Sequence, residues 1–362
     1  MKVVRRMTPF LLAVFCVAAL APAASASLRA RHPVAPRSPA IVGDLAAYLW
    51  SEGEATYDFD GQIGAITVTN SSTGVYQVDV PNLSDFTGGM VQVTPYDSKD
   101  TCAVDGWTPS GSDLQVGVSC YSLRGHLADS LFDLIATQPL TAPAGTFDYS
   151  WVNRPTKSGT LTGPYEYNSA GKQNSVRHLG KGRYEVTFGG GTSKGTRGTV
   201  KVSAYGAGAG DCAASGWHGT SKGVVVGVNC YRSSGKAVNR LFDVTYARST
   251  NLMGLSGFPT ANALVTAAGT VQTQYSSSST AAVTVSHHRR GLYRVQLVNT
   301  TEADGGGDIQ VSPVTGSKDH CTVVDWDGGT SVNTVATVQC FDGRGHAVNS
   351  AFTLQFVVAF LV

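Results

Sequence analysis

The sequence has few of the features that identify enzymes, membrane proteins or nucleic-acid binders. It lacks Gly-x-Ser-x-Gly, His-Glu-x-x-His, Cys-x-x-Cys and any recognisable pair of acidic residues, so no catalytic residue, metal ligand or cofactor is predicted. Charged residues make up only 14% of the chain and are interspersed, so no basic surface for nucleic acid is expected. Segments with helical periodicity are scarce, which argues against an α-helical fold.

The N-terminal segment has the three-part form of a secretory signal. Lys2, Arg5 and Arg6 precede the apolar run "FLLAVFCVAALA", and "ASA" then gives a cleavage site at the end of residues 1–26. The mature chain then has a net charge near −1, because the signal carries three cations and no acidic residue. Residues 27–42 are rich in Pro and Arg, which predicts a disordered linker. No later apolar run is long enough to cross a membrane, so we expect a secreted protein.

Three related stretches contain the remaining cysteines. Each reads Cys-x4-Trp, then Val-x-Cys followed by an aromatic residue, then Gly, Asp or Asn, and Phe at fixed spacing, and the first two have a further Val in the pattern Val-x-Val-x-Cys. Removal of the signal removes Cys16 and leaves six cysteines, two in each stretch, which predicts one local disulfide per repeat. The expected pairs are Cys102 with Cys120, Cys212 with Cys230, and Cys321 with Cys340. Each would contribute about 3 kcal/mol by restricting the unfolded chain.

The repeat also extends upstream and defines three modules. A Gly-x-Tyr-x-Val element precedes each first cysteine, and short runs of Val, Thr, Tyr and Phe alternate with polar residues between turn-forming clusters. We therefore expect an all-β fold of three tandem antiparallel β-sandwich-like modules, each with one internal disulfide, at residues 43–138, 139–250 and 251–362. Three such modules in tandem predict an elongated array.

An aromatic segment opens each module. Trp50, Trp151 and Tyr275 are interpreted as corresponding residues of these segments. The Trp that follows each first cysteine is placed in a connection that the disulfide ties back to the sheet. This pattern predicts six or seven strands in each module.

The recurrent tryptophans are the main candidates for ligand-binding residues. Trp107, Trp217 and Trp326 stand at one fixed offset from a cysteine. An exposed indole at such a site could stack on a sugar ring, whereas a buried one would plug the end of the sandwich beside the disulfide. The fixed spacing favours the plug, because modules repeat what they need to fold.

Other polar motifs are interpreted as turns. The "RGH" of residues 124–126 recurs in the third module but not in the second, which favours a polar hairpin tip. The basic "HHRR" of residues 287–290 is interpreted as a solvated turn. A weak calcium site that uses Asp97, Asp100 or Asp319 stays open as an alternative.

The combined motifs resemble a repeat of uncharacterised secreted actinobacterial proteins. The resemblance covers nearly all of residues 43–362 and includes "AYLWSE" and "YEYNSAGKQNSV". It implies secretion and a repeated, disulfide-containing β module, and it implies no activity.

These observations favour a secreted, non-enzymatic repeat protein with a binding role or a structural role in the cell envelope. The alternative is a carbohydrate-binding module array in which the tryptophans or the variable loops hold a glycan. In either case the expected partner is an extracellular glycan or another envelope component. An enzyme with an unrecognised site ranks last.

Overall fold

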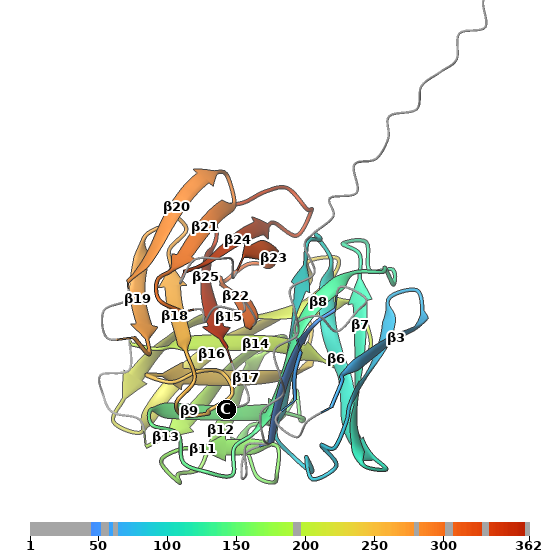
Figure 1. Cartoon of the computed structure of the whole chain (residues 1–362). Helices are drawn as coiled ribbons and strands as arrows, with labels where there is room; N and C mark the ends of the chain where they lie inside the picture. Colours follow the sequence, from blue (N-terminus) through green and yellow to red (C-terminus); the bar gives the residue numbers. More distant parts are fainter. Residues whose placement is uncertain are drawn as a thin grey trace, which may run out of the picture. The chain divides into compact units, whose positions relative to one another are not determined.

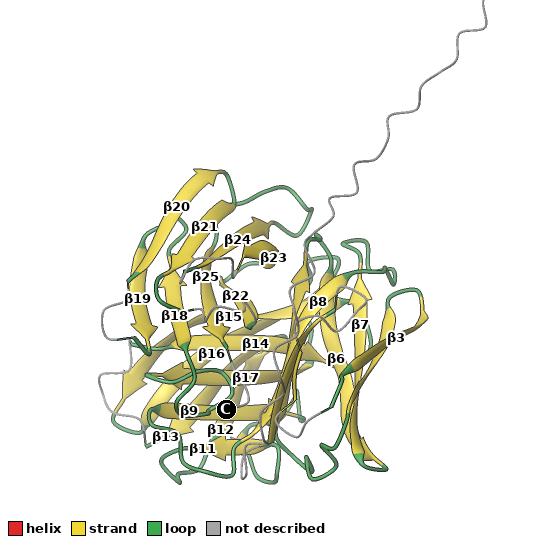
Figure 2. Ribbon diagram, in the orientation of Figure 1, coloured by secondary structure: helices red, strands yellow, loops and turns green. Residues whose placement is uncertain are grey.

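The computed structural model describes residues 45–51, 58–60, 64–190, 197–278, 282–300, 307–327 and 333–358 (Figure 1). The predicted signal, residues 1–26, and the predicted linker, residues 27–42, lie outside the described residues. Figure 2 shows strands joined by loops throughout the described part, where no helix is found. That part accordingly has no helix long and apolar enough to cross a membrane.

The described strands divide among the three modules. Module 1 contains β1 (Leu45–Trp50), β2 (Asp58–Asp60), β3 (Thr67–Ser72), β4 (Val75–Val80), β5 (Met90–Tyr96), β6 (Thr101–Ser110), β7 (Asp113–Tyr121) and β8 (Leu131–Gln138). Module 2 contains β9 (Thr146–Val152), β10 (Gly159–Thr160), β11 (Glu166–Asn168), β12 (Ser175–Gly180), β13 (Arg183–Gly189), β14 (Thr199–Tyr205), β15 (Gly210–Thr220), β16 (Gly223–Arg232) and β17 (Leu241–Arg248). Module 3 contains β18 (Thr260–Val265), β19 (Val271–Ser276), β20 (Val283–Arg289), β21 (Leu292–Leu297), β22 (Asp308–Val314), β23 (His320–Asp327), β24 (Thr334–Phe341) and β25 (Ala351–Val357).

Alternation of side chains makes each module a sandwich. In β13, Tyr184, Val186 and Phe188 are buried, while the residues between them are only half-buried. This period of two places one row of apolar side chains against the facing half of the module. In module 2 these side chains meet Val202 and Phe242 from β14 and β17 in a single core. The expected all-β fold of three antiparallel sandwich modules is confirmed.

The three expected disulfides are also confirmed. The cysteines of each pair stand directly opposite one another on neighbouring antiparallel strands, with Cα atoms 4.0–4.1 Å apart. The bonds join Cys102 to Cys120, Cys212 to Cys230 and Cys321 to Cys340. Each therefore fastens the central hairpin of its own module.

Every sheet is shared between two modules. The strand orders are β2-β1-β8-β5-β23-β24-β21-β20, β10-β12-β13-β16-β15-β22-β25-β18-β19, and β11-β9-β17-β14-β6-β7-β4-β3. A short parallel contact makes each junction, namely Tyr205 with Val104, Ala214 with Val314, and Val323 with Tyr96. The last of these joins module 3 to module 1, so the strand pairing is cyclic. The expected elongated array is wrong, because its two end modules would not share a sheet.

Three expectations about the modules are corrected. The described residues form eight strands in module 1, nine in module 2 and eight in module 3, and not six or seven in each. The segment that contains the recurrent Trp is not a connection but the strand that bears the first cysteine, as β15 shows with Cys212 and Trp217. Its many small residues have low β-propensity, and the strand forms through pairing with β16 across a bulge.

Tyr275 does not correspond to Trp50 and Trp151. Those two tryptophans pair with an Asp on the last strand of their modules, whereas the same place in module 3 holds Leu264, opposite Thr353. Tyr275 lies one strand further out, on β19.

Candidate functional site

In each module the recurrent Gly is hydrogen-bonded to the recurrent Asp or Asn, and we call this pair the structural lock. The amide groups of Gly74, Gly182 and Gly291 donate to Oδ1 of Asp129, Asn239 and Asn349 at 2.7–2.8 Å. All three glycines have φ between +67° and +71°, a region that favours Gly. A Cβ atom at any of them would come within 3.0 Å of backbone atoms of the last hairpin. This motif therefore serves the fold.

The recurrent Tyr and Phe are structural as well. The Tyr184 hydroxyl accepts the amide of Arg240 and donates to the carbonyl of Pro155. Its ring packs on Phe242 at 5.0 Å, and the corresponding pairs in modules 1 and 3 lie 5.2 and 5.1 Å apart.

The recurrent tryptophans differ in burial. Trp326 is 9% exposed and belongs to the core of module 3. Trp107 is half-buried and donates from Nε1 to the carbonyl of Gly88 at 2.8 Å, within a cluster of three other aromatic side chains. Trp217 is half-buried against the core of module 2. The structure thus gives Trp326 the position expected of a plug and leaves parts of Trp107 and Trp217 in solvent.

The "RGH" motif lies at a hairpin tip, as expected, but the interpretation of "HHRR" as a turn is corrected: residues 287–289 belong to strand β20 and only Arg290 lies in the turn. Gly125 has φ +84°, and the amide of Ser122 donates to the carbonyl of His126 at 2.8 Å. His287 lies on β20, where Nε2 is 3.1 Å from Oδ1 of Asn349, and Arg290 follows in the turn.

The calcium alternative finds no cluster to support it. Asp97 and Asp100 lie in the loop before β6, and Asp319 lies in the corresponding loop of module 3. Asp319 is instead 3.4 Å from the hydroxyl of Thr315. In the described part of the chain, no group of three or more His, Cys, Asp or Glu side chains could hold a metal ion.

A buried polar centre lies where the three modules meet, and the sequence did not reveal it. The ammonium group of Lys201 donates to the carbonyls of Val93 and Val311 and to the hydroxyl of Thr94, at 2.7–2.9 Å. Gln92 of module 1 donates in turn to Thr245 of module 2 at 2.9 Å. Burial lowers the pKa of Lys201 to about 7, although nearby aspartates act in the opposite direction. These bonds connect all three modules.

Two further carboxyl groups, those of Asp133 and Asp243, are fully buried, and Asp133 interacts electrostatically with Lys201. Burial raises the pKa of Asp133 and of Asp243 well above the usual value. Neither carboxyl has a hydrogen-bond partner among the described residues, which favours the neutral, protonated form. A neighbouring cavity of about 20 Å³, lined in part by Lys201 and His320, has room for about one water molecule. The centre thus has a structural place in the fold and no space for an organic ligand.

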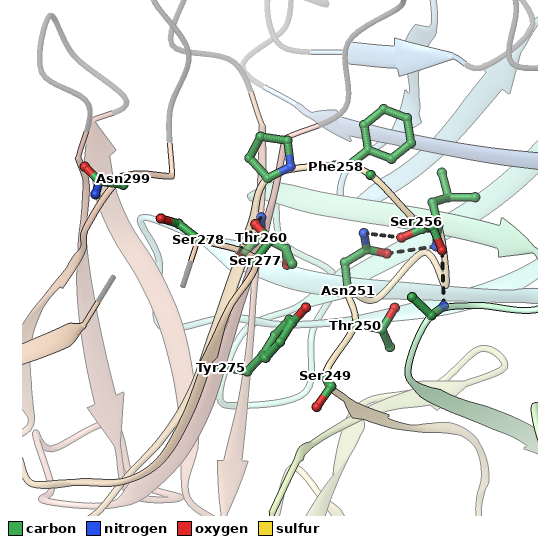
Figure 3. Close-up of a pocket in the computed structure, with 14 residues that line it drawn as sticks. Ser249, Thr250, Asn251, Ser256, Phe258, Thr260, Tyr275, Ser277, Ser278 and Asn299 are labelled. Atoms are coloured by element: carbon green, nitrogen blue, oxygen red, sulfur yellow. Dashed lines mark hydrogen bonds between the residues drawn. The ribbon is translucent and has the colours of Figure 1, made fainter. Parts of the chain in front are cut away.

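A groove of about 460 Å³ offers a better site for a ligand (Figure 3). Its walls come from the segment that links β17 to β18, from the start of β18, and from the end of β19. Figure 3 shows Tyr275 on one side and Thr250 with Asn251 on the other. Its volume falls within the usual range for small-molecule sites.

The described lining of the groove is neutral. None of the 14 lining residues within the described part of the chain is charged, and most carry a hydroxyl group, an amide group or an apolar ring. Such a lining gives no electrostatic attraction to an ionic ligand, but it supplies donors and acceptors beside the Tyr275 and Phe258 rings.

One wall is held in place by Asn251. Its side-chain amide donates to the carbonyl of Leu255 at 2.8 Å, and its Oδ1 accepts the amides of Met253 and Leu255 at 3.1 Å. Ser256 accepts the amide of Ala144 at 3.1 Å, which fastens the same wall to the start of module 2. This part of the groove is therefore formed before any ligand binds.

Tyr275 lines the groove because the residue opposite it on the neighbouring strand is not aromatic, unlike the corresponding residues of the other two modules. In module 1 the corresponding Phe59 stacks on Tyr48 at 5.5 Å, and in module 2 Tyr167 stacks on Tyr149 at 5.8 Å. In module 3 the residue opposite Tyr275 is Asn262, which cannot stack. The ring therefore lines the groove, half-buried.

The groove could not be found from the sequence repeat. Its segment, residues 249–259, has no counterpart in the recurring motif, and nothing in the sequence pattern pointed to it.

No family model matches the chain, and no curated protein or solved structure is significantly similar to it. The resemblance to secreted actinobacterial proteins stays a prediction.

Proposed function

We propose that this protein is a secreted, non-enzymatic binding protein that holds a neutral carbohydrate in the groove beside Tyr275. The observation that carries the proposal is the combination of an uncharged, hydroxyl- and amide-rich lining with one available aromatic ring. A sugar presents hydroxyl groups at its edges and apolar C–H groups on its faces, and this lining complements both.

A single groove, and not the recurrent tryptophans of the three modules, is the binding site in this proposal. Trp326 is buried, and Trp107 is surrounded by the rings of Trp151, Tyr165 and Tyr205. The groove lies in a segment that differs among the modules, where a binding function is expected to vary. One neutral site on a cyclic scaffold therefore replaces the array of equivalent sites that the sequence suggested.

Secretion is supported by the three disulfides, which form and persist in oxidising, extracellular compartments. The predicted signal supports it independently. An extracellular glycan or a glycan of the cell envelope is the partner consistent with both the compartment and the groove.

The experiment begins with a glycan array probed with the mature chain, followed by calorimetric titration of the best neutral glycan. Tyr275→Ala is expected to weaken binding about tenfold or more, because the ring supplies the apolar face of the site. Tyr167→Ala is the matched control, since Tyr167 holds the same strand position in module 2 but lies outside the groove. Circular dichroism checks that both variants are folded.

Two results would refute the proposal. One is that the folded protein binds no neutral glycan at millimolar concentration. The other is that Trp217→Ala abolishes binding while Tyr275→Ala leaves it unchanged, which would place the sugar on the recurrent tryptophan.

A further inference from the structure

The tip of the β20–β21 hairpin in module 3 carries a local concentration of positive charge. His288, Arg289, Arg290 and Arg294 are all exposed. Within the described residues, none of the three arginines has an ion pair or a hydrogen-bonded partner. Because β20 is the outermost described strand of its sheet, this basic tip lies at an edge that no other described strand pairs with.

The corresponding hairpins show that the fold does not need these charges. His287 lies opposite Tyr293, just as His178 lies opposite Tyr184 and Asn70 opposite Tyr76. The three positions that follow are Ser71, Ser72 and Thr73 in module 1, Leu179, Gly180 and Lys181 in module 2, and His288, Arg289 and Arg290 in module 3.

The next strand of this hairpin, β21, also carries more positive charge than its counterpart β13 in module 2. In module 2, Glu185 forms an ion pair with Arg177, its partner on the neighbouring strand. In module 3 the same two places hold Arg294 and Ser286. Module 3 thus has one cation beside the basic tip where module 2 has an ion pair. This arrangement adds like-charge repulsion and supplies the cation with no partner among the described residues.

We propose that the basic tip of module 3 binds a phosphodiester-bearing envelope polymer. A guanidinium group matches the geometry of a phosphate and can donate two hydrogen bonds to it. Several such groups along one exposed edge favour a chain of phosphates over a single small anion. The site lies apart from the neutral groove and does not depend on it.

A nucleic acid is the less fitting occupant, because the described residues of the tip include no exposed Trp, Tyr or Phe ring on which bases could stack. Tyr293 is buried, and the His287 ring is stacked on it at 4.7 Å. The other residues of β20 between Thr284 and Ser286 are small or aliphatic. Binding would therefore depend on phosphate charge and not on bases.

The test uses the mature full-length chain and inorganic polyphosphate of defined length, with binding followed by calorimetry at low and at physiological salt. Arg289→Gln combined with Arg290→Gln is expected to weaken binding roughly tenfold and to reduce its salt dependence. Lys181→Gln combined with Arg183→Gln removes two exposed cations from the equivalent hairpin of module 2 and should change binding less than about twofold.

The proposal predicts that purified wall phosphodiester polymer binds in the same way and that single-stranded oligonucleotides of equal charge bind no better than polyphosphate. Equal weakening by the two double variants would contradict it, because binding would then follow net charge alone. Absence of polyphosphate binding at low salt, or a clear preference for oligonucleotides, would also contradict it. All substituted side chains are exposed, so the variants should remain folded.

Discussion

Substitution of Gly182 by Ala tests whether the recurrent motif is a structural lock. Gly182 has φ +69°, and an Ala Cβ would stand 2.6 Å from the carbonyl oxygen of Cys230 and 2.8 Å from the amide nitrogen of Val238. Both are backbone atoms, one on β16 and the other in the segment that links β16 to β17, and they cannot move aside as a flexible side chain would. The substitution therefore forces the hairpin and the Gly-x-Tyr strand apart.

The expected cost has two parts. The left-handed conformation costs about 1–2 kcal/mol for a residue with a Cβ atom. The steric overlap adds about 1–3 kcal/mol, the usual range for overpacking. We expect Gly182→Ala to lower the free energy of unfolding by about 3 kcal/mol in total.

Gly171→Ala is the matched control for this measurement. Gly171 belongs to the same module and has φ +65°, but a Cβ atom there would have no neighbour within 4 Å. Its substitution should cost only the conformational part, about 1 kcal/mol. Urea unfolding of the oxidised protein measures both values, and equal losses for the two variants would refute the reasoning, because the contact with the hairpin would then carry no energy.

The remaining predictions concern the buried carboxyls and the tryptophans. Burial raises the pKa of Asp243 in the folded protein above its value in the unfolded chain. The folded protein therefore loses stability as pH rises from about 4, the pKa of the unfolded Asp, toward the raised folded pKa. The loss is roughly 1.4 kcal/mol for each pH unit in that interval. Asp243→Asn should therefore have little effect on the free energy of unfolding in urea at about pH 4 and should stabilise the protein increasingly as pH rises toward about 8; an equal effect at these two pH values would argue against a protonated carboxyl. Trp326→Ala should cost about 3–5 kcal/mol in the same assay, because the side chain is buried, and Trp217→Ala should cost clearly less. The reverse order would contradict the burial described for the two indoles.

The sequence repeat predicted the parts of the fold that depend on local pattern. Matched cysteines gave the three disulfides, and alternation located strands such as β13 and β14, because pairing and a two-residue period act over short distances. The strand of Trp217 was missed, since its glycines and alanines have low β-propensity and pairing across the hairpin determines its conformation.

The cyclic arrangement could not be predicted from the repeat. Gln92, Lys201 and Gln310 alternate with valines or isoleucine, as in a strand with one face in solvent, yet all three are buried where the modules meet. An alternating strand has the same pattern whether its polar face meets water or another polar face. The distinction depends on contacts between residues more than 100 positions apart, such as Lys201 with Val93.

The groove was hidden for a related reason. The sequence pattern grouped Tyr275 with Trp50 and Trp151. Only the register of β18 and β19 shows that Tyr275 lies opposite Asn262 and not opposite another aromatic ring. Its availability follows from a difference between the modules and not from the features that they share.

The most direct test of the proposed function is a crystal structure of the protein with the neutral glycan that binds it most tightly. The proposal predicts sugar density in the groove, with a ring in contact with Tyr275 and hydroxyl groups within hydrogen-bond distance of the Thr250–Asn251 side. Density over Trp107 or Trp217 with an empty groove would contradict it.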